Sequence, residues 1–104
     1  MQWLSDYRGL RIRLTEERRE HILEHPEMAP MESAIAEALA HPHVVVESLR
    51  DADAQLYYRY YSHTMVGGKF VCVVVKIQAE DAFVLTAYLT DQMKKGNIIW
   101  TEKP

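Results

Sequence analysis

From Val44 to Trp100 the chain is a succession of short β-branched and aromatic runs separated by turn residues. Runs of this length and composition are typical of β-strands, and the connections between them are too short to hold a helix. Strands joined by short connections pair antiparallel with their neighbours in the chain. We therefore expect an antiparallel meander with strands over residues 44–48, 55–62, 70–77 and 83–90, and a short last strand over 98–100.

Alternation along the runs 55–62 and 83–90 assigns their side chains to the two faces of the sheet. We expect the face that is covered by helices to hold Leu56, Tyr58, Tyr60, Phe83, Leu85 and Leu89. The open face then carries Tyr57, Arg59, Tyr61, Thr86, Tyr88 and Thr90. Because this second set is polar, aromatic and partly basic, we expect a ligand to bind on the open face.

Two short helices are expected before the meander. Thr15 has the character of an N-cap and is followed by two acidic residues, which predicts a helix over residues 16–25 that Pro26 ends. Pro30 suits the first turn of a second helix, which Pro42 closes. Apolar residues recur along this second helix at four-residue spacing, at Met31, Ile35 and Leu39.

The residues before the first helix are expected to contribute little to the sheet. Residues 1–8 resemble an arm, and residues 10–14 alternate apolar and basic side chains as a short edge strand does. A chain of 104 residues has room for one domain. The predicted fold is therefore a single α+β domain over 1–104, with two short N-terminal helices packed on one face of a four- to five-stranded antiparallel sheet.

Charge and cysteine content restrict the classes of function. The net charge of −3 argues against a dedicated nucleic-acid-binding protein, although a local basic patch is compatible with it. Cys72 is the only cysteine, so no disulfide forms within the chain and a reducing compartment fits best. The first residues lack the features of a signal peptide, and the longest apolar run, 70–75, is too short to cross a bilayer. We expect a cytoplasmic protein with no membrane partner.

One motif resembles a metal site. His21, Glu24 and His25 match the H-x-x-E-H pattern of inverted zinc peptidases, whose histidines share one helix face. Such enzymes need a third ligand from a distant helix, and His25 lies beside Pro26 where the helix ends. We therefore expect no metal or other cofactor. Cys72 lies within an apolar strand and is expected to behave as a small hydrophobic residue rather than a nucleophile.

The open face has the residue types for RNA chemistry. The tyrosines that flank Arg59 suit either cross-strand packing or the stacking of bases beside a phosphate. In metal-free RNA cleavage one side chain accepts the proton of the 2′-hydroxyl, another donates to the leaving oxygen, and a cation stabilises the charged phosphorane. Histidine, arginine, lysine and tyrosine suit these roles near neutral pH.

Several short motifs, spread from about residue 14 to residue 100, resemble the barnase, EndoU, colicin and RelE-like nuclease superfamily found in phages and bacteria. The motifs are Leu14-Thr15-Glu16-Glu17-Arg18, His21-Ile22, His25-Pro26-Glu27-Met28, Ala38-Leu39-Ala40-His41-Pro42 and Val84-Leu85-Thr86-Ala87-Tyr88. The resemblance implies two helices with an antiparallel sheet. It also implies a metal-independent ribonuclease, often the toxin of a toxin–antitoxin pair.

By position, the resemblance implies that the catalytic residues are His21, His25, Arg59, Thr86 and Tyr88. RNA contacts are expected from Tyr57, Tyr61, Lys76, Lys94 and Lys95. The expected partners are RNA and an antitoxin protein. The alternative is a non-catalytic protein-binding or dimerisation module of the same fold, whose aromatic open face docks a partner protein or a second copy of the chain.

Overall fold

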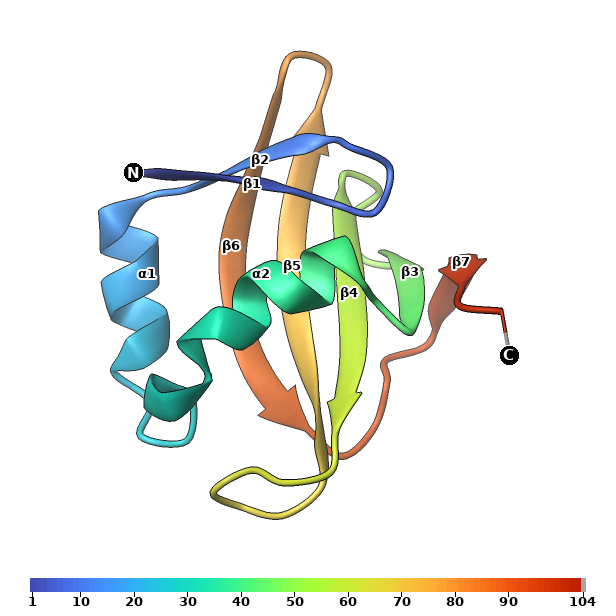
Figure 1. The fold of residues 1–104 in the computed structure, drawn as a ribbon. Helices are drawn as coiled ribbons and strands as arrows, with labels where there is room; N and C mark the ends of the chain where they lie inside the picture. The colour runs from blue at the N-terminus through green and yellow to red at the C-terminus, as the bar shows by residue number, and fades with distance from the viewer. Residues whose placement is uncertain (104) are drawn as a thin grey trace.

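The computed structural model describes residues 1–103, which form one mixed seven-stranded sheet, two α-helices and a short 3-10 helix (Figure 1). The strands are β1 (Gln2–Ser5), β2 (Arg11–Leu14), β3 (Val44–Ser48), β4 (Ala54–Tyr61), β5 (Lys69–Gln78), β6 (Asp81–Thr90) and β7 (Gly96–Thr101). The helices are α1 (Glu16–Leu23), η1 (Ala29–Met31) and α2 (Glu32–Ala40). The strand order is β1-β2-β6-β5-β4-β3-β7.

The predicted fold class is wrong, because the sheet is larger than expected and not wholly antiparallel. The expected N-terminal arm contains β1, which pairs antiparallel with β2 in a hairpin. The expected edge strand β2 lies inside the sheet, where Arg13 pairs in parallel with Phe83 of β6. The turn between the two strands depends on Gly9, whose φ of 87° is a conformation that favours glycine. The glycine thus joins the two segments that were expected to be an arm and a separate edge strand.

The last strand forms as expected but at an unexpected place. β7 does not pair with β6, which precedes it in the chain; it pairs antiparallel with β3 at the other edge of the sheet. The connection over residues 91–95 carries the chain across the sheet on the face opposite the helices. There the backbone N–H of Lys94 donates a hydrogen bond to the hydroxyl of Tyr58, at 2.9 Å.

Both helices lie over one face of the sheet, with α2 crossing in front of the long strands (Figure 1). Thr15 caps α1 as predicted, since its hydroxyl accepts a hydrogen bond from the backbone N–H of Arg18 at 3.2 Å. The helix ends at Leu23, two residues before the predicted end at His25, because Pro26 keeps the preceding residue out of the helical conformation. Among residues 1–103, neither helix combines the length and the apolar character that a membrane-crossing helix needs.

The faces of β4 are the reverse of those predicted. Tyr57 and Tyr61 point to the helices, whereas Leu56 and Tyr58 belong to a smaller cluster on the other face. All of these residues are aromatic or aliphatic, so the pattern of β4 does not distinguish its two sides. A one-residue error in phase transfers every side chain of the strand to the other face.

β6 contains a bulge that changes the phase of its alternation. The register with β5 shifts so that Val74 pairs with Thr86 while Val75 pairs with Val84, which leaves Leu85 as the extra residue. Before the bulge the residues that face the helices are Ala82 and Val84, and after it they are Ala87 and Leu89. The predicted inward positions of Phe83 and Leu85 are therefore wrong, whereas that of Leu89 is correct.

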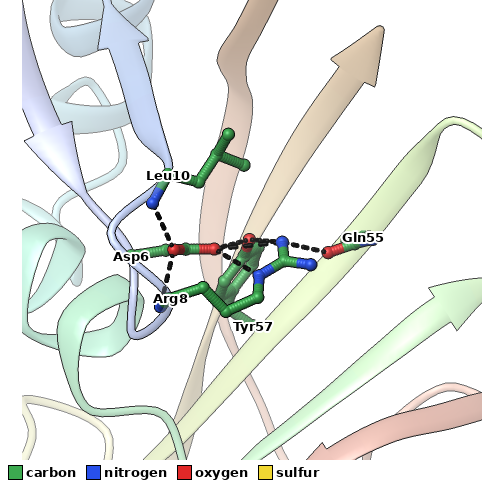
Figure 2. Close-up of polar contacts among 5 residues, drawn as sticks. All are labelled: Asp6, Arg8, Leu10, Gln55 and Tyr57. Carbon is green, nitrogen blue, oxygen red and sulfur yellow. Dashed lines mark hydrogen bonds and ion pairs between the residues drawn. The ribbon is translucent and has the colours of Figure 1, made fainter. Parts of the chain in front are cut away.

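The N-terminal hairpin is fastened to β4 by the buried carboxylate of Asp6 (Figure 2). One oxygen accepts hydrogen bonds from the backbone N–H groups of Arg8 and Leu10, at 2.8 and 2.9 Å. The other accepts from the hydroxyl of Tyr57 at 2.8 Å and from the guanidinium of Arg8 at 3.1 Å. The guanidinium also donates to the side-chain oxygen of Gln55. The carboxylate is thus fully partnered, and it joins a turn to a strand 51 residues further along the chain.

We predict that Asp6→Ala lowers the free energy of unfolding by about 3 kcal/mol, because it leaves the buried hydroxyl and two N–H groups without an acceptor. Urea denaturation followed by circular dichroism measures the change. Asp91→Ala is the matched control, since Asp91 is an exposed carboxylate paired with Lys69 at the surface. Similar losses in the two variants would contradict the role given to Asp6.

The same cluster predicts a loss of stability at alkaline pH. Burial, followed by the hydrogen bond to Asp6, raises the pKa of Tyr57 well above its usual value of 10.0. The Tyr57 hydroxyl ionises near pH 10 in the unfolded chain but not in the folded one. Its contribution to stability is therefore present below pH 10 and is lost as the pH rises further. Above pH 10, Tyr57 alone should lower the free energy of unfolding by about 1.4 kcal/mol per pH unit. Between about pH 9 and 11, the free energy of unfolding measured by urea denaturation should fall less steeply with pH for Tyr57→Phe than for the wild type. Parallel curves for the two proteins would refute this assignment.

Candidate functional site

A pocket of about 580 Å³ opens on the sheet face opposite the helices. Its floor is apolar and is formed by Ala54, Leu56 and Val74 from β4 and β5. Thr86 and the ring of Tyr88, both from β6, form one side. Its volume and its largely apolar lining are typical of a small-molecule site.

Strand register brings these residues together. Leu56, Val74 and Thr86 are opposite one another on three neighbouring strands, and so are Tyr58, Cys72 and Tyr88 in the adjacent row. Two loops from different parts of the chain complete the pocket. The end of β3 and the loop that follows it contribute Ser48, Leu49 and Arg50, and the β6–β7 connection contributes Lys94 and Lys95.

The β3–β4 loop is shaped by Ser48, whose hydroxyl accepts hydrogen bonds from the backbone N–H groups of Arg50 and Asp51, at 3.2 and 3.3 Å. This turn brings Arg50 to the rim of the pocket. The carboxylate of Asp51 is occupied by Lys76, at 2.6 Å, and that ammonium group lowers the pKa of Asp51. The loop therefore presents a cation to the pocket, while Lys76 neutralises one of the two acids of the loop.

The three cations of the pocket have no acidic partner, a property that they share with Arg11, Arg18 and Lys103 within residues 1–103. Six of the twelve lysines and arginines form ion pairs with carboxylates: Arg8, Arg13, Arg19, Arg59, Lys69 and Lys76. Within residues 1–103, Arg50, Lys94 and Lys95 form none, and no carboxylate residue lines the pocket. The pocket is thus a locally positive concavity on a chain whose net charge is −3.

A buried polar cluster lies beneath the β6–β7 connection. Burial raises the pKa of Tyr58 to about 12 and that of the Cys72 thiol to about 11. Burial also raises the pKa of Tyr88, and the neighbouring Cys72 adds to the effect. In the described part of the chain the Tyr88 hydroxyl has no hydrogen-bond partner and is shielded from solvent. Tyr88 therefore offers its ring to the pocket, 5.9 Å from the ammonium group of Lys94, and stays protonated near neutral pH.

The structure separates Arg59 from the pocket. Arg59 lies on the helix side of β4, where it donates to the backbone carbonyl of His41 at 2.7 Å and approaches the carboxylate of Glu37 to 3.5 Å. Tyr61 donates to the same carboxylate, and Tyr57 is held by Asp6. The predicted grouping of Arg59, Tyr57 and Tyr61 with Thr86 and Tyr88 on one face does not form, because the faces of β4 are reversed.

The histidines of α1 are also remote from the pocket. His21 and His25 are exposed on the helix side, with their rings 6.4 Å apart, and each lies near a glutamate of its own segment. Among residues 1–103, no three His, Cys, Asp or Glu side chains are placed to hold a metal ion together. Of the predicted site residues, the pocket unites Thr86, Tyr88, Lys94 and Lys95. Lys76 forms an ion pair with Asp51 and does not line the pocket.

Sequence reasoning missed Arg50 and the apolar floor. Leu56 was assigned to the helix side through the phase error in β4, and Val74 lies in a run that is apolar on both faces. Arg50 had only the weak signal of a cation next to a turn. Its approach to Lys94 and Lys95 depends on the pairing of β7 with β3, which no local pattern shows.

Comparisons of the chain with protein-family models, curated proteins and solved structures found no match. The resemblance to the nuclease superfamily thus stays a prediction.

We predict that the thiol of Cys72 is unreactive in the native protein, because it is buried and its pKa is raised to about 11. Iodoacetamide at about pH 8 should leave the folded protein unmodified and alkylate it after unfolding in urea, as mass spectrometry measures. Rapid alkylation without urea would show that the β6–β7 connection does not seal this cluster.

Proposed function

We propose that this domain binds single-stranded RNA on the open sheet face, with one nucleotide in the pocket formed by β4, β5, β6 and the two loops. The observation that supports this most directly is the gathering of Arg50, Lys94 and Lys95, all without acidic partners, around an apolar floor. A ligand that matches both features has an anionic group and a flat, largely apolar ring. A nucleotide has this combination.

The two parts of the pocket suit the two parts of a nucleotide. Leu56 and Val74 form a dry surface against which a base can lie, and Thr86 offers a hydroxyl to a polar edge of the base. The three cations are exposed at the rim, where a phosphate group can remain partly hydrated. Since phosphate contacts supply much of the affinity for nucleic acid, a local cluster outweighs an acidic chain average.

The geometry supports binding more strongly than cleavage. In the described residues no imidazole lines the pocket, and the hydroxyl of Tyr88 is protonated and shielded from solvent. A general base for the 2′-hydroxyl must lie within hydrogen-bond reach of it. The ribonuclease and toxin activities, the antitoxin partner, the homodimer and the cytoplasmic location remain predictions from the sequence.

We predict that Lys94→Glu/Lys95→Glu weakens RNA binding at least tenfold, because it places two negative charges beside the phosphate. Fluorescence anisotropy with a labelled oligouridylate measures the affinity over a series of salt concentrations. With at most three phosphate contacts, the slope of log K against log salt should be about −2 for the wild type and shallower for the variant.

The matched control compares two single substitutions, Lys95→Glu and Lys103→Glu. Lys103 is exposed and does not line the pocket. Lys103→Glu makes the same change in net charge and should leave binding nearly unchanged. Equal effects of the two single substitutions would mean that only overall charge matters, and the proposal would fail. Incubation of the same RNA with the protein and a chelator, followed by electrophoresis, tests cleavage separately.

A further inference from the structure

We propose that Tyr60 is a second base-stacking position, which receives another base of the same RNA strand whose first base occupies the pocket. This inference rests on the proposed function and adds to it a second base position, so that the bound strand has at least two nucleotides. It concerns a residue outside the pocket, on the same face of the sheet.

Tyr60 has the exposure that stacking requires. Its side chain is 46% exposed, whereas Tyr57 and Tyr58 on the same strand are fully buried. It lies directly opposite Phe70 on β5, and the two rings meet edge to face with their centroids 5.2 Å apart. A base can therefore stack on an aromatic ring that is already held by a neighbour, so that little side-chain freedom is lost on binding.

A close approach to the β4–β5 hairpin also positions the ring. A Cβ atom on Gly68 would lie 2.2 Å from the hydroxyl oxygen of Tyr60, so the absence of a side chain there leaves room for the tyrosine. Tyr60 is thus located by Phe70 on the strand beside it and by Gly68 at the end of its ring. Neither contact serves the packing under the helices, which lie on the other face.

The distance from the pocket suits a single strand. Tyr60 is four residues along β4 from Leu56 on the pocket floor, which corresponds to about 13 Å. Tyr58 lies midway between them, and the connection that carries Lys94 crosses the sheet above it. An RNA strand that runs from the pocket to Tyr60 therefore passes over this connection, whose exposed Lys94 and Lys95 side chains are available to its phosphate groups. Bases in a duplex are stacked on each other and cannot be spread apart in this way.

Titration followed by NMR tests the inference with two probes, uridine 5′-monophosphate and 5′-phosphorylated triuridylate. The monophosphate reports on the pocket alone, and the ratio of the two dissociation constants reports on the contribution of further nucleotides. For Tyr60→Ala we expect the dissociation constant of the triuridylate to rise about tenfold, while that of the monophosphate is unchanged. Tyr60→Phe, which keeps the ring, should behave as the wild type.

Trp3→Ala is the matched control, because Trp3 is a similarly exposed aromatic residue, 49% exposed, on the edge strand β1. It should leave both dissociation constants unchanged. If the triuridylate binds Tyr60→Ala as tightly as the wild type, the stacking position is refuted while the pocket stands. If neither probe binds the wild type, the proposed function itself fails and the inference falls with it.

Discussion

The buried carboxylate of Asp6 determines how the two faces of the sheet are used. The carboxylate accepts a hydrogen bond from the hydroxyl of Tyr57 and so holds that side chain on the helix side of β4, next to the N-terminal turn (Figure 2). Because side chains alternate along a strand, Tyr58 and Tyr60 must then lie on the opposite face. The interaction that attaches the hairpin to the sheet therefore fastens Tyr57 on the helix side, together with the packing of its ring in the core, and Tyr58 and Tyr60 are left on the face of the candidate site.

Chain topology supplies the charge of the candidate site. The connection from β6 to β7 has to cross the sheet because β7 pairs with β3 at the far edge, and the crossing places Lys94 and Lys95 above the open face. The loop after β3 adds Arg50 from the other side. The bulge at Leu85 turns Thr86 and Tyr88 toward the same space. The pocket is thus a consequence of long-range pairing and of one extra residue in a strand.

These origins explain which features were predictable from the sequence. The cap at Thr15, the breaks at Pro26 and Pro42 and the four meander strands follow from local chemistry, and they were found. The pairing of β7 with β3 and the single parallel bridge of β2 to β6 depend on contacts between distant residues, and no periodicity marks them. The face of β4 was undetermined because tyrosines occur on both sides of it. Lys94 and Lys95 were expected RNA contacts, and the structure places both at the pocket.

Ion pairing shows which cations of the sheet are already engaged within the fold. Arg59 is the most prominent cation of the sequence, set among tyrosines, yet it is held by Glu37 and the carbonyl of His41 and serves the junction of α2 with β4. Lys94 and Lys95 lie in an unremarkable turn and have no carboxylate beside them within residues 1–103. An exposed cation without a counter-ion gains most from an anionic ligand, because no existing pair has to be broken first. For this reason the net charge of −3 does not argue against the site: the acidic residues that produce it pair with cations elsewhere or lie outside the pocket.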